Sequence, residues 1–196
     1  MQIDFFWDPG STNTYFAWHL LKPIAQRYNA EVVLQPFNLG YVFRHHNYVL
    51  MEEPPAKIRN RKRDLDRWAR KYKLPFRMPG EFPIKTSRIL RGALAMRRWG
   101  LETKFIDEVF KRYWEQDDAS VASDEGLEKV ASTLDIDPVE FLVILSSDET
   151  GEVLRQKTRA ALDRGVFGAP SFIIENELYW GKDRMEFIED HLSRLA

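Results

Sequence analysis

The chain of 196 residues carries 29 Lys and Arg against 30 Asp and Glu, a formal net charge of −1. It therefore lacks the positive field with which nucleic-acid-binding proteins attract phosphates. Apolar residues make up 44% and aromatic residues 13%, which provides a large core and argues against disorder. The absence of cysteine excludes disulfides, thiolate metal sites and a Cys-x-x-Cys redox centre, so any thiol chemistry needs an external thiol.

The first forty residues predict a strand, a helix and a second strand. Residues 3–7 form a short apolar run that stops at the turn signal Asp8-Pro9-Gly10. Apolar residues then recur at helical spacing over 15–28, and the side chains at 11–14 offer N-caps. Residues 31–36 contain the β-branched run of a covered strand. This order predicts one βαβ unit with parallel strands.

The middle of the chain is predicted to be almost entirely helical. Apolar stripes at helical spacing fall over residues 65–72, 105–114 and 127–134, and a further helix is expected over 149–164. Asp137-Pro138 supplies a cap and a proline at the first helical position before another helix.

The C-terminal segment predicts a hairpin and a final helix. Residues 171–174 and 178–180 are strand-like and are separated by the turn Glu175-Asn176-Glu177. Asp183 is predicted to cap a helix whose apolar residues over 185–195 form one stripe.

The two ends of the chain therefore predict a single α/β domain. We expect residues 1–42 and 162–196 to build a discontinuous sheet domain, with residues 43–161 as a large all-helical insertion. Clefts at the junction of such regions commonly bind ligands.

Other features of the sequence bear on location and partners. No apolar run reaches the ~20 residues needed to cross a bilayer, and the N-terminus lacks the basic region of an export signal, so we expect a cytoplasmic protein that binds neither membrane nor nucleic acid. The pair His45-His46 supplies no complete ligand set, so no metal site is expected. The basic stretch over 57–73 predicts a solvated helix face, with a phosphate or carboxylate site as the alternative.

Two groups of motifs resemble one known family. The first comprises Asp4-Phe5-Phe6-Trp7-Asp8 with Ser11 and Tyr15, then Asp64-Leu65-x-Arg67-Trp68-Ala69 and Tyr72-x-x-Pro75. The second comprises Val166-Phe167-Gly168-Ala169-Pro170-Ser171-Phe172, then Trp180-Gly181-x-Asp183-Arg184. These motifs, in this order and over nearly the whole chain, resemble those of the 2-hydroxychromene-2-carboxylate isomerases and of the related kappa-class glutathione transferases. The resemblance implies a DsbA-like thioredoxin fold, a homodimer, and glutathione bound between the sheet domain and the helical insertion.

The resemblance also implies roles for individual residues. Ser11 matches the catalytic serine beside the glutathione sulfur, Ala169 the residue whose backbone pairs with the cysteinyl unit, and Asp183 the acid that holds the γ-glutamyl ammonium. The other cofactor-binding positions implied are Asn47, Lys57, Pro170 and Lys182. The family's proline after the serine is missing here, so Thr12 or Thr14 remains an alternative source of the hydroxyl.

The implied chemistry requires a thiolate, because a free thiol with a pKa near ~8.5 is a poor nucleophile. Ser11 at the start of a helix would donate a hydrogen bond to sulfur, and the free N–H groups and helix dipole would favour the anion. A cis peptide bond before Pro170, which the resemblance implies, would turn the backbone of Ala169 towards the ligand.

The implied function is glutathione-dependent cis-trans isomerisation of 2-hydroxychromene-2-carboxylate or a similar aryl pyruvate in aromatic-compound degradation. The thiolate would add to the substrate, and its elimination after bond rotation would regenerate glutathione. An aromatic substrate pocket could draw on Tyr15, Phe43, His45, His46 and Trp180. Two alternatives stay open: a kappa-like glutathione transferase or peroxidase, and a non-catalytic thioredoxin-like binding module.

Overall fold

The computed structural model describes residues 1–49 and 52–196, and in these it places four strands in one mixed sheet. The strands are β1 (Gln2–Trp7), β2 (Glu31–Pro36), β3 (Ser171–Ile174) and β4 (Glu177–Trp180), in the order β2-β1-β3-β4. β1 and β2 pair in parallel, whereas β1 with β3 and β3 with β4 pair antiparallel. The predicted βαβ start and terminal hairpin are confirmed, and both ends of the chain build one sheet.

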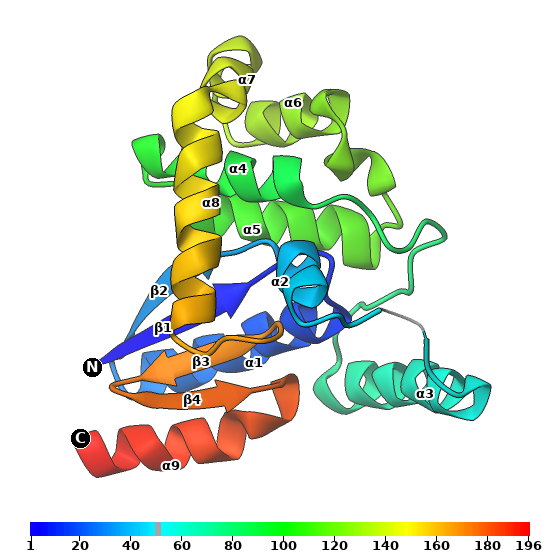
Figure 1. The fold of residues 1–196 in the computed structure, drawn as a ribbon, viewed down its shortest axis with the longest axis vertical. Helices are drawn as coiled ribbons and strands as arrows, with labels where there is room; N and C mark the ends of the chain where they lie inside the picture. The colour runs from blue at the N-terminus through cyan, green and yellow to red at the C-terminus, as the bar shows by residue number, and fades with distance from the viewer. Residues whose placement is uncertain (50–51) are drawn as a thin grey trace.

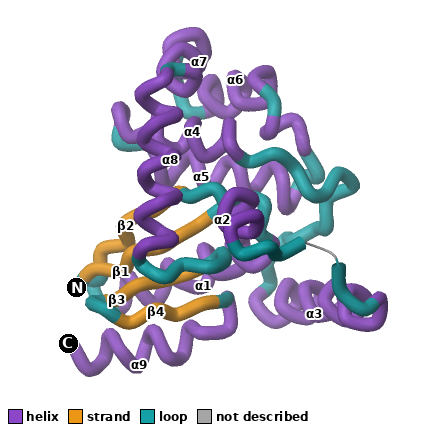
Figure 2. Tube along the Cα trace, viewed as in Figure 1, coloured by secondary structure: helices purple, strands orange, loops and turns teal. Residues whose placement is uncertain are grey.

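Helices make up most of the remaining regular structure, and Figure 2 shows the strands gathered at one end of the molecule. The α-helices are α1 (Thr12–Arg27), α2 (Leu39–His45), α3 (Pro55–Tyr72), α4 (Ser87–Met96), α5 (Glu102–Phe110), α6 (Asp124–Thr133), α7 (Pro138–Ser146), α8 (Asp148–Asp163) and α9 (Met185–Leu195). Shorter helical turns are η1 (Arg97–Trp99), η2 (Lys111–Glu115), η3 (Ala119–Ala122) and η4 (Lys182–Arg184). In the described ranges, none of the helices has both the length and the apolarity of a membrane span.

Helices cover both faces of the sheet because successive strand residues point to opposite sides. Phe5 of β1 stacks on Trp18 of α1, with 5.6 Å between ring centroids, and α1 packs against α9. On the other face, Phe6 lies in a buried cluster with Val42 of α2 and Ala161 of α8. The sheet is therefore the middle layer between α1 with α9 and α8 with α2 (Figure 1).

The helices α4 to α7 form the region beyond the sheet (Figure 1). The rings of Phe105 in α5 and Phe141 in α7 pack 5.9 Å apart beside Gly92, where an added Cβ would lie 2.7 Å from Phe105 Cζ. The π-helical turn η2 follows α5 and carries the fully buried Trp114, whose Nε1 donates a hydrogen bond to the carbonyl of Pro9 at 3.1 Å. This bond ties the helical region to the loop after β1.

One predicted helix cap is confirmed and another is wrong. The Asp137 carboxylate accepts a hydrogen bond from the Val139 N–H at 2.8 Å at the start of α7, as predicted. Asp183, however, does not cap α9: Arg184 is its N-cap, without a side-chain cap bond. Gly181 has a φ of 110° and turns the chain into η4, so Asp183 lies inside a helical turn instead of just before a helix.

Candidate active site

Ser11 lies at the N-terminus of α1 and caps this helix. Its backbone is extended, and its Oγ accepts a hydrogen bond from the Thr14 N–H at 3.3 Å. In the described part of the chain, the N–H groups of Thr12 and Asn13 have no acceptor, and the first turn of α1 holds no acidic residue. Free N–H groups and the helix dipole therefore give this end a positive potential. Thr14 itself is fully buried, whereas Thr12 is half-buried.

The structure brings Ser11 to the loop before β3. Its Oγ donates a hydrogen bond to the carbonyl of Ala169 at 2.9 Å, across 158 positions of sequence. The peptide bond between Ala169 and Pro170 is cis, as the resemblance implied. The N–H of Ala169 has no acceptor among the residues that the structure describes. A helix N-terminus, a hydroxyl and a free backbone donor thus meet at one place.

The turn after β4 lies beside this group. The carbonyl of Pro170 accepts a hydrogen bond from the Gly181 N–H at 3.0 Å, which places Lys182 and Asp183 next along the chain. Asp183 is exposed, and its carboxylate lies 3.4 Å from the guanidinium of Arg184. An exposed carboxylate in this turn is accessible to a cationic group of a ligand.

Lys182 forms a bridge to α3 and is not exposed to solvent at the site. Its side chain is only 12% exposed, its Nζ lies 4.3 Å from the ring centroid of Trp68, and Asp64 Oδ2 is 3.9 Å away. Burial lowers the pKa of the Lys182 ammonium, against the raising effect of Asp64 and Asp183. Lys182 therefore holds η4 against α3.

Asn47 and Lys57 lie outside this group. Asn47 follows α2 with a φ of 52° and is exposed. Lys57 in α3 has a side chain that is 65% exposed and an Nζ 2.9 Å from the carboxylate of Glu53. Within the described ranges, no hydrogen bond or ion pair joins either side chain to Ser11 or Ala169.

Asp8 holds the loop that leads to Ser11, a role that the sequence analysis missed. Its Oδ1 accepts from the Gly10 N–H at 2.8 Å, and its Oδ2 accepts from the Leu39 N–H at 2.9 Å and from Thr86 Oγ1 at 3.0 Å. Burial raises the pKa of the Asp8 carboxyl to about 6, although these three hydrogen bonds lower it. The sequence signal was an aspartate that ends a buried strand, but two of its three partners, Leu39 and Thr86, come from distant segments.

Exposed aromatic rings flank the cis-proline loop. Phe167 and Trp180 are 44% and 49% exposed, and their ring centroids lie 5.1 Å apart. An added Cβ at Gly168 would lie 2.6 Å from Trp180 Nε1, so the glycine lets the indole rest on the loop. Tyr15, by contrast, is fully buried and donates its hydroxyl to Glu115 at 3.1 Å. Tyr15 belongs to the core, and the suggestion that it walls a substrate pocket is wrong.

Comparisons with known proteins identify the family of the chain. The family model of the DSBA-like thioredoxin domain matches residues 2–193. The 2-hydroxychromene-2-carboxylate isomerase of Sphingobium xenophagum is 29% identical over 200 residues, which cover 97% of each chain. Glutathione S-transferase kappa 2 of Caenorhabditis elegans is 25% identical over 205 residues, which cover 97% of this chain and 91% of that relative.

A solved structure shows the same likeness. A 2-hydroxychromene-2-carboxylate isomerase superimposes with a TM-score of 0.88 at 28% identity, over 100% of this chain and 96% of that chain. The resemblance expected from the motifs and the predicted α/β fold with a helical insertion are confirmed. The chain belongs to the DSBA-like thioredoxin family.

Proposed function

We propose that the protein binds glutathione beside Ser11 and uses its thiolate to isomerise 2-hydroxychromene-2-carboxylate or a similar aryl pyruvate. The observation that carries this proposal is the hydrogen bond between Ser11 Oγ and the Ala169 carbonyl, at a helix N-terminus, in a chain without cysteine. The relatives named 2-hydroxychromene-2-carboxylate isomerase support the reaction. We place the protein in the cytoplasm, as a homodimer.

Glutathione would bind by an exchange of hydrogen bonds. Its cysteinyl unit offers an N–H to the Ala169 carbonyl and a C=O to the free Ala169 N–H, in the manner of an added strand. The Ser11 hydroxyl then no longer donates to that carbonyl and instead donates a hydrogen bond to the sulfur. Each polar group keeps a partner, which avoids the cost of about 1–3 kcal/mol for an unpaired buried donor or acceptor.

The same site would favour the thiolate over the thiol. The hydrogen bond from Ser11, the free N–H groups of Thr12 and Asn13, and the helix dipole all interact more strongly with S⁻ than with SH. The pKa of bound glutathione should therefore fall below the ~8.5 of an ordinary thiol.

The proposed reaction consumes no glutathione. In the ring-opened form of the substrate, an unsaturated α-keto acid, the thiolate adds to the carbon β to the ketone, and the displaced π electrons move to the ketone oxygen as an enolate. The former double bond is then single and rotates. When the enolate electrons return, the C–S bond breaks and the thiolate leaves with the trans isomer formed. Phe167 and Trp180 present an exposed apolar surface on which the aromatic ring of the substrate would pack.

The function is tested by titrating the protein with glutathione while the ultraviolet absorbance of the thiolate is followed at neutral pH. In the Ser11→Ala variant we expect a higher thiol pKa and a turnover that is lower by about 10- to 100-fold, because a donor to the reacting anion is lost. Loss of the cap costs about 1 kcal/mol of stability. Thr12→Ala is the matched control and should keep turnover; full turnover by Ser11→Ala would contradict the proposal.

Asp183→Ala is expected to weaken glutathione binding by about tenfold or more, because a charge-assisted hydrogen bond to the γ-glutamyl ammonium is removed. Turnover at saturating glutathione should change little. Calorimetry measures the affinity, and Asp163→Ala, an exposed aspartate at the end of α8, provides the control. An unchanged affinity in Asp183→Ala would remove this residue from the site.

The relative named glutathione S-transferase kappa 2 favours a second candidate, a transferase or peroxidase on the same site. Stoichiometric consumption of glutathione would identify that activity, whereas the isomerase leaves its concentration unchanged. A protein that binds no glutathione would instead be a thioredoxin-like binding module.

A further inference from the structure

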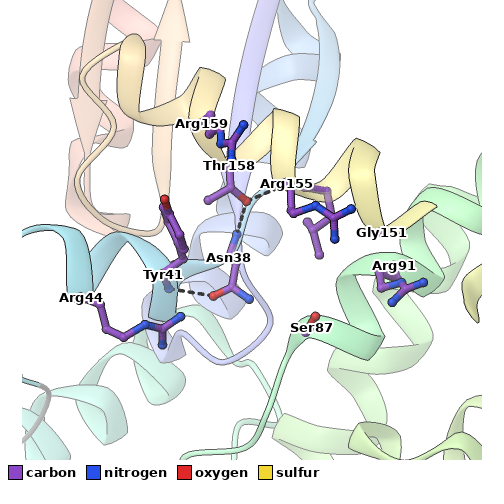
Figure 3. Close-up of a pocket in the computed structure, with 10 residues that line it drawn as sticks. Asn38, Tyr41, Arg44, Ser87, Arg91, Gly151, Arg155, Thr158 and Arg159 are labelled. Carbon is purple, nitrogen blue, oxygen red and sulfur yellow. Dashed lines mark hydrogen bonds between the residues drawn. The ribbon is translucent and has the colours of Figure 1, made fainter. Parts of the chain in front are cut away.

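A separate pocket lies between α2, α4 and α8, and arginines dominate its lining (Figure 3). Its volume is about 180 Å³. Arg155 and Arg159 project from α8, Arg44 from α2 and Arg91 from α4 (Figure 3). Three helices that are distant in sequence thus place four guanidinium groups around one cavity.

Negative charge balances these arginines only in part, because Asp148 acts on Arg91 and Glu152 acts on Arg155 and Arg159. Of the four arginines of the pocket, only Arg155 forms an ion pair within the described residues. Its guanidinium lies 2.7 Å from the carboxylate of Glu152. Arg44 and Arg159 have exposed side chains and no such partner in those residues. Like charges around one cavity repel one another. An anion bound among them relieves that repulsion.

Arg91 is the most constrained of the group. Its Nη2 donates a hydrogen bond to the carbonyl of Ser147 at 2.5 Å, while its Nε is buried without a hydrogen-bond partner in the described residues. Burial lowers the pKa of this guanidinium, and the neighbouring Arg88 and Arg155 lower it further, whereas Asp148 raises it. The side chain is therefore fixed beside the cavity.

Most neutral polar groups of the lining form hydrogen bonds within the protein, and one hydroxyl is left available to a ligand. Thr158 Oγ1 accepts from the Asn38 N–H at 3.0 Å and donates to the Leu154 carbonyl at 2.8 Å, and Asn38 Oδ1 accepts from the Tyr41 N–H at 2.8 Å. These bonds fix the wall between α2 and α8. The hydroxyl of Ser87 has no partner within the described ranges and adds one more donor.

We propose that this pocket binds a small phosphate monoester, separately from the glutathione site. Guanidinium forks match phosphate oxygens with paired hydrogen bonds, and a dianion neutralises more of the clustered charge than a carboxylate does. Arg155 and Arg159 lie one turn apart on α8 and can bind one group together. The volume is below the roughly 300–1,000 Å³ of drug-sized sites, so the organic part is small.

The pocket adjoins the two segments that hold Asp8. Asn38 precedes Leu39 and Ser87 follows Thr86, and both Leu39 and Thr86 donate hydrogen bonds to Asp8. A phosphate bound between the helices contacts these segments in the folded protein only. Binding should therefore raise the thermal midpoint as well as release heat.

Calorimetric titration with glycerol 3-phosphate at low salt tests the proposal. We expect saturable binding at one site, competition by inorganic phosphate, and no competition by acetate at the same ionic strength. Arg44→Gln and Arg159→Gln, which change exposed side chains, should each lower the affinity about tenfold or more. Arg98→Gln removes an equally exposed arginine that faces Glu140 at 3.7 Å, and it should bind as the wild type does.

Three results would overturn the assignment: no saturable binding, equal losses in Arg98→Gln and the pocket variants, or displacement of the probe by glutathione. The last result would place the probe at Ser11. The main titration does not depend on the proposed isomerase, because it measures phosphate binding without glutathione; glutathione is added only in the final competition.

Discussion

The Asp8→Ala variant is expected to be less stable than the wild type by about 3–5 kcal/mol at pH 4, because three partly buried donors lose their acceptor. The difference should shrink as pH rises. Burial raises the folded pKa of the Asp8 carboxyl to about 6, above the ordinary value of 3.8 for an aspartate. The stability that Asp8 contributes is therefore fully present below pH 3.8 and is lost as pH rises through 6, a change of about 2–3 kcal/mol by pH 8.

Urea unfolding of both proteins from pH 4 to pH 8 measures this difference. Asp163→Ala serves as the control, because its carboxylate is exposed and has no partner among the described residues, so its replacement should change stability little. A destabilisation of Asp8→Ala that grows with pH would show that the hydrogen bonds from Gly10, Leu39 and Thr86 outweigh burial.

Trp114→Phe should destabilise the protein by about 2–4 kcal/mol, since the Pro9 carbonyl loses its buried donor and the smaller ring leaves a cavity. Trp114 is fully buried and stacks on Phe76 with 5.9 Å between centroids. Because Pro9 lies two residues before Ser11, glutathione affinity should fall as well. Urea unfolding and calorimetry measure the two effects.

Trp99→Phe is the matched control for this prediction. Trp99 is partly buried against the same core, and in the described residues its indole makes no hydrogen bond. The prediction holds if Trp114→Phe lowers the free energy of unfolding more than Trp99→Phe does, and if only Trp114→Phe weakens glutathione binding. Equal effects of the two variants would show that the hydrogen bond to Pro9 contributes little.

Local patterns were sufficient for many elements of the fold, although no predicted range covered α2 or α4. Residues 31–36 and 171–174 are strands at the predicted bounds, because apolar β-branched runs between turn signals have few alternatives. The cap of α7 was also predicted correctly, since Asp137 and Pro138 act on their immediate neighbours. The start of α9 was predicted wrongly, because a positive φ at Gly181 changes the path of the chain just before it.

The site depends on contacts that no local pattern contains. Ser11 and Ala169 are 158 positions apart, and only the resemblance suggested that they meet. The partners of Asp8 come from two loops, and the arginines of the phosphate pocket come from three helices. Such groupings follow from tertiary packing, which determines both how buried each side chain is and which charges surround it.

The bridge from Lys182 to Trp68 and Asp64 has a consequence for ligand binding. It fastens the turn that carries Asp183 to α3, the helix that carries Lys57, so the two segments should loosen or tighten together. Glutathione bound at one end by that turn would then reduce the fluctuations of the whole of α3. Amide hydrogen exchange along α3 would slow when glutathione binds, even at positions that the ligand never touches.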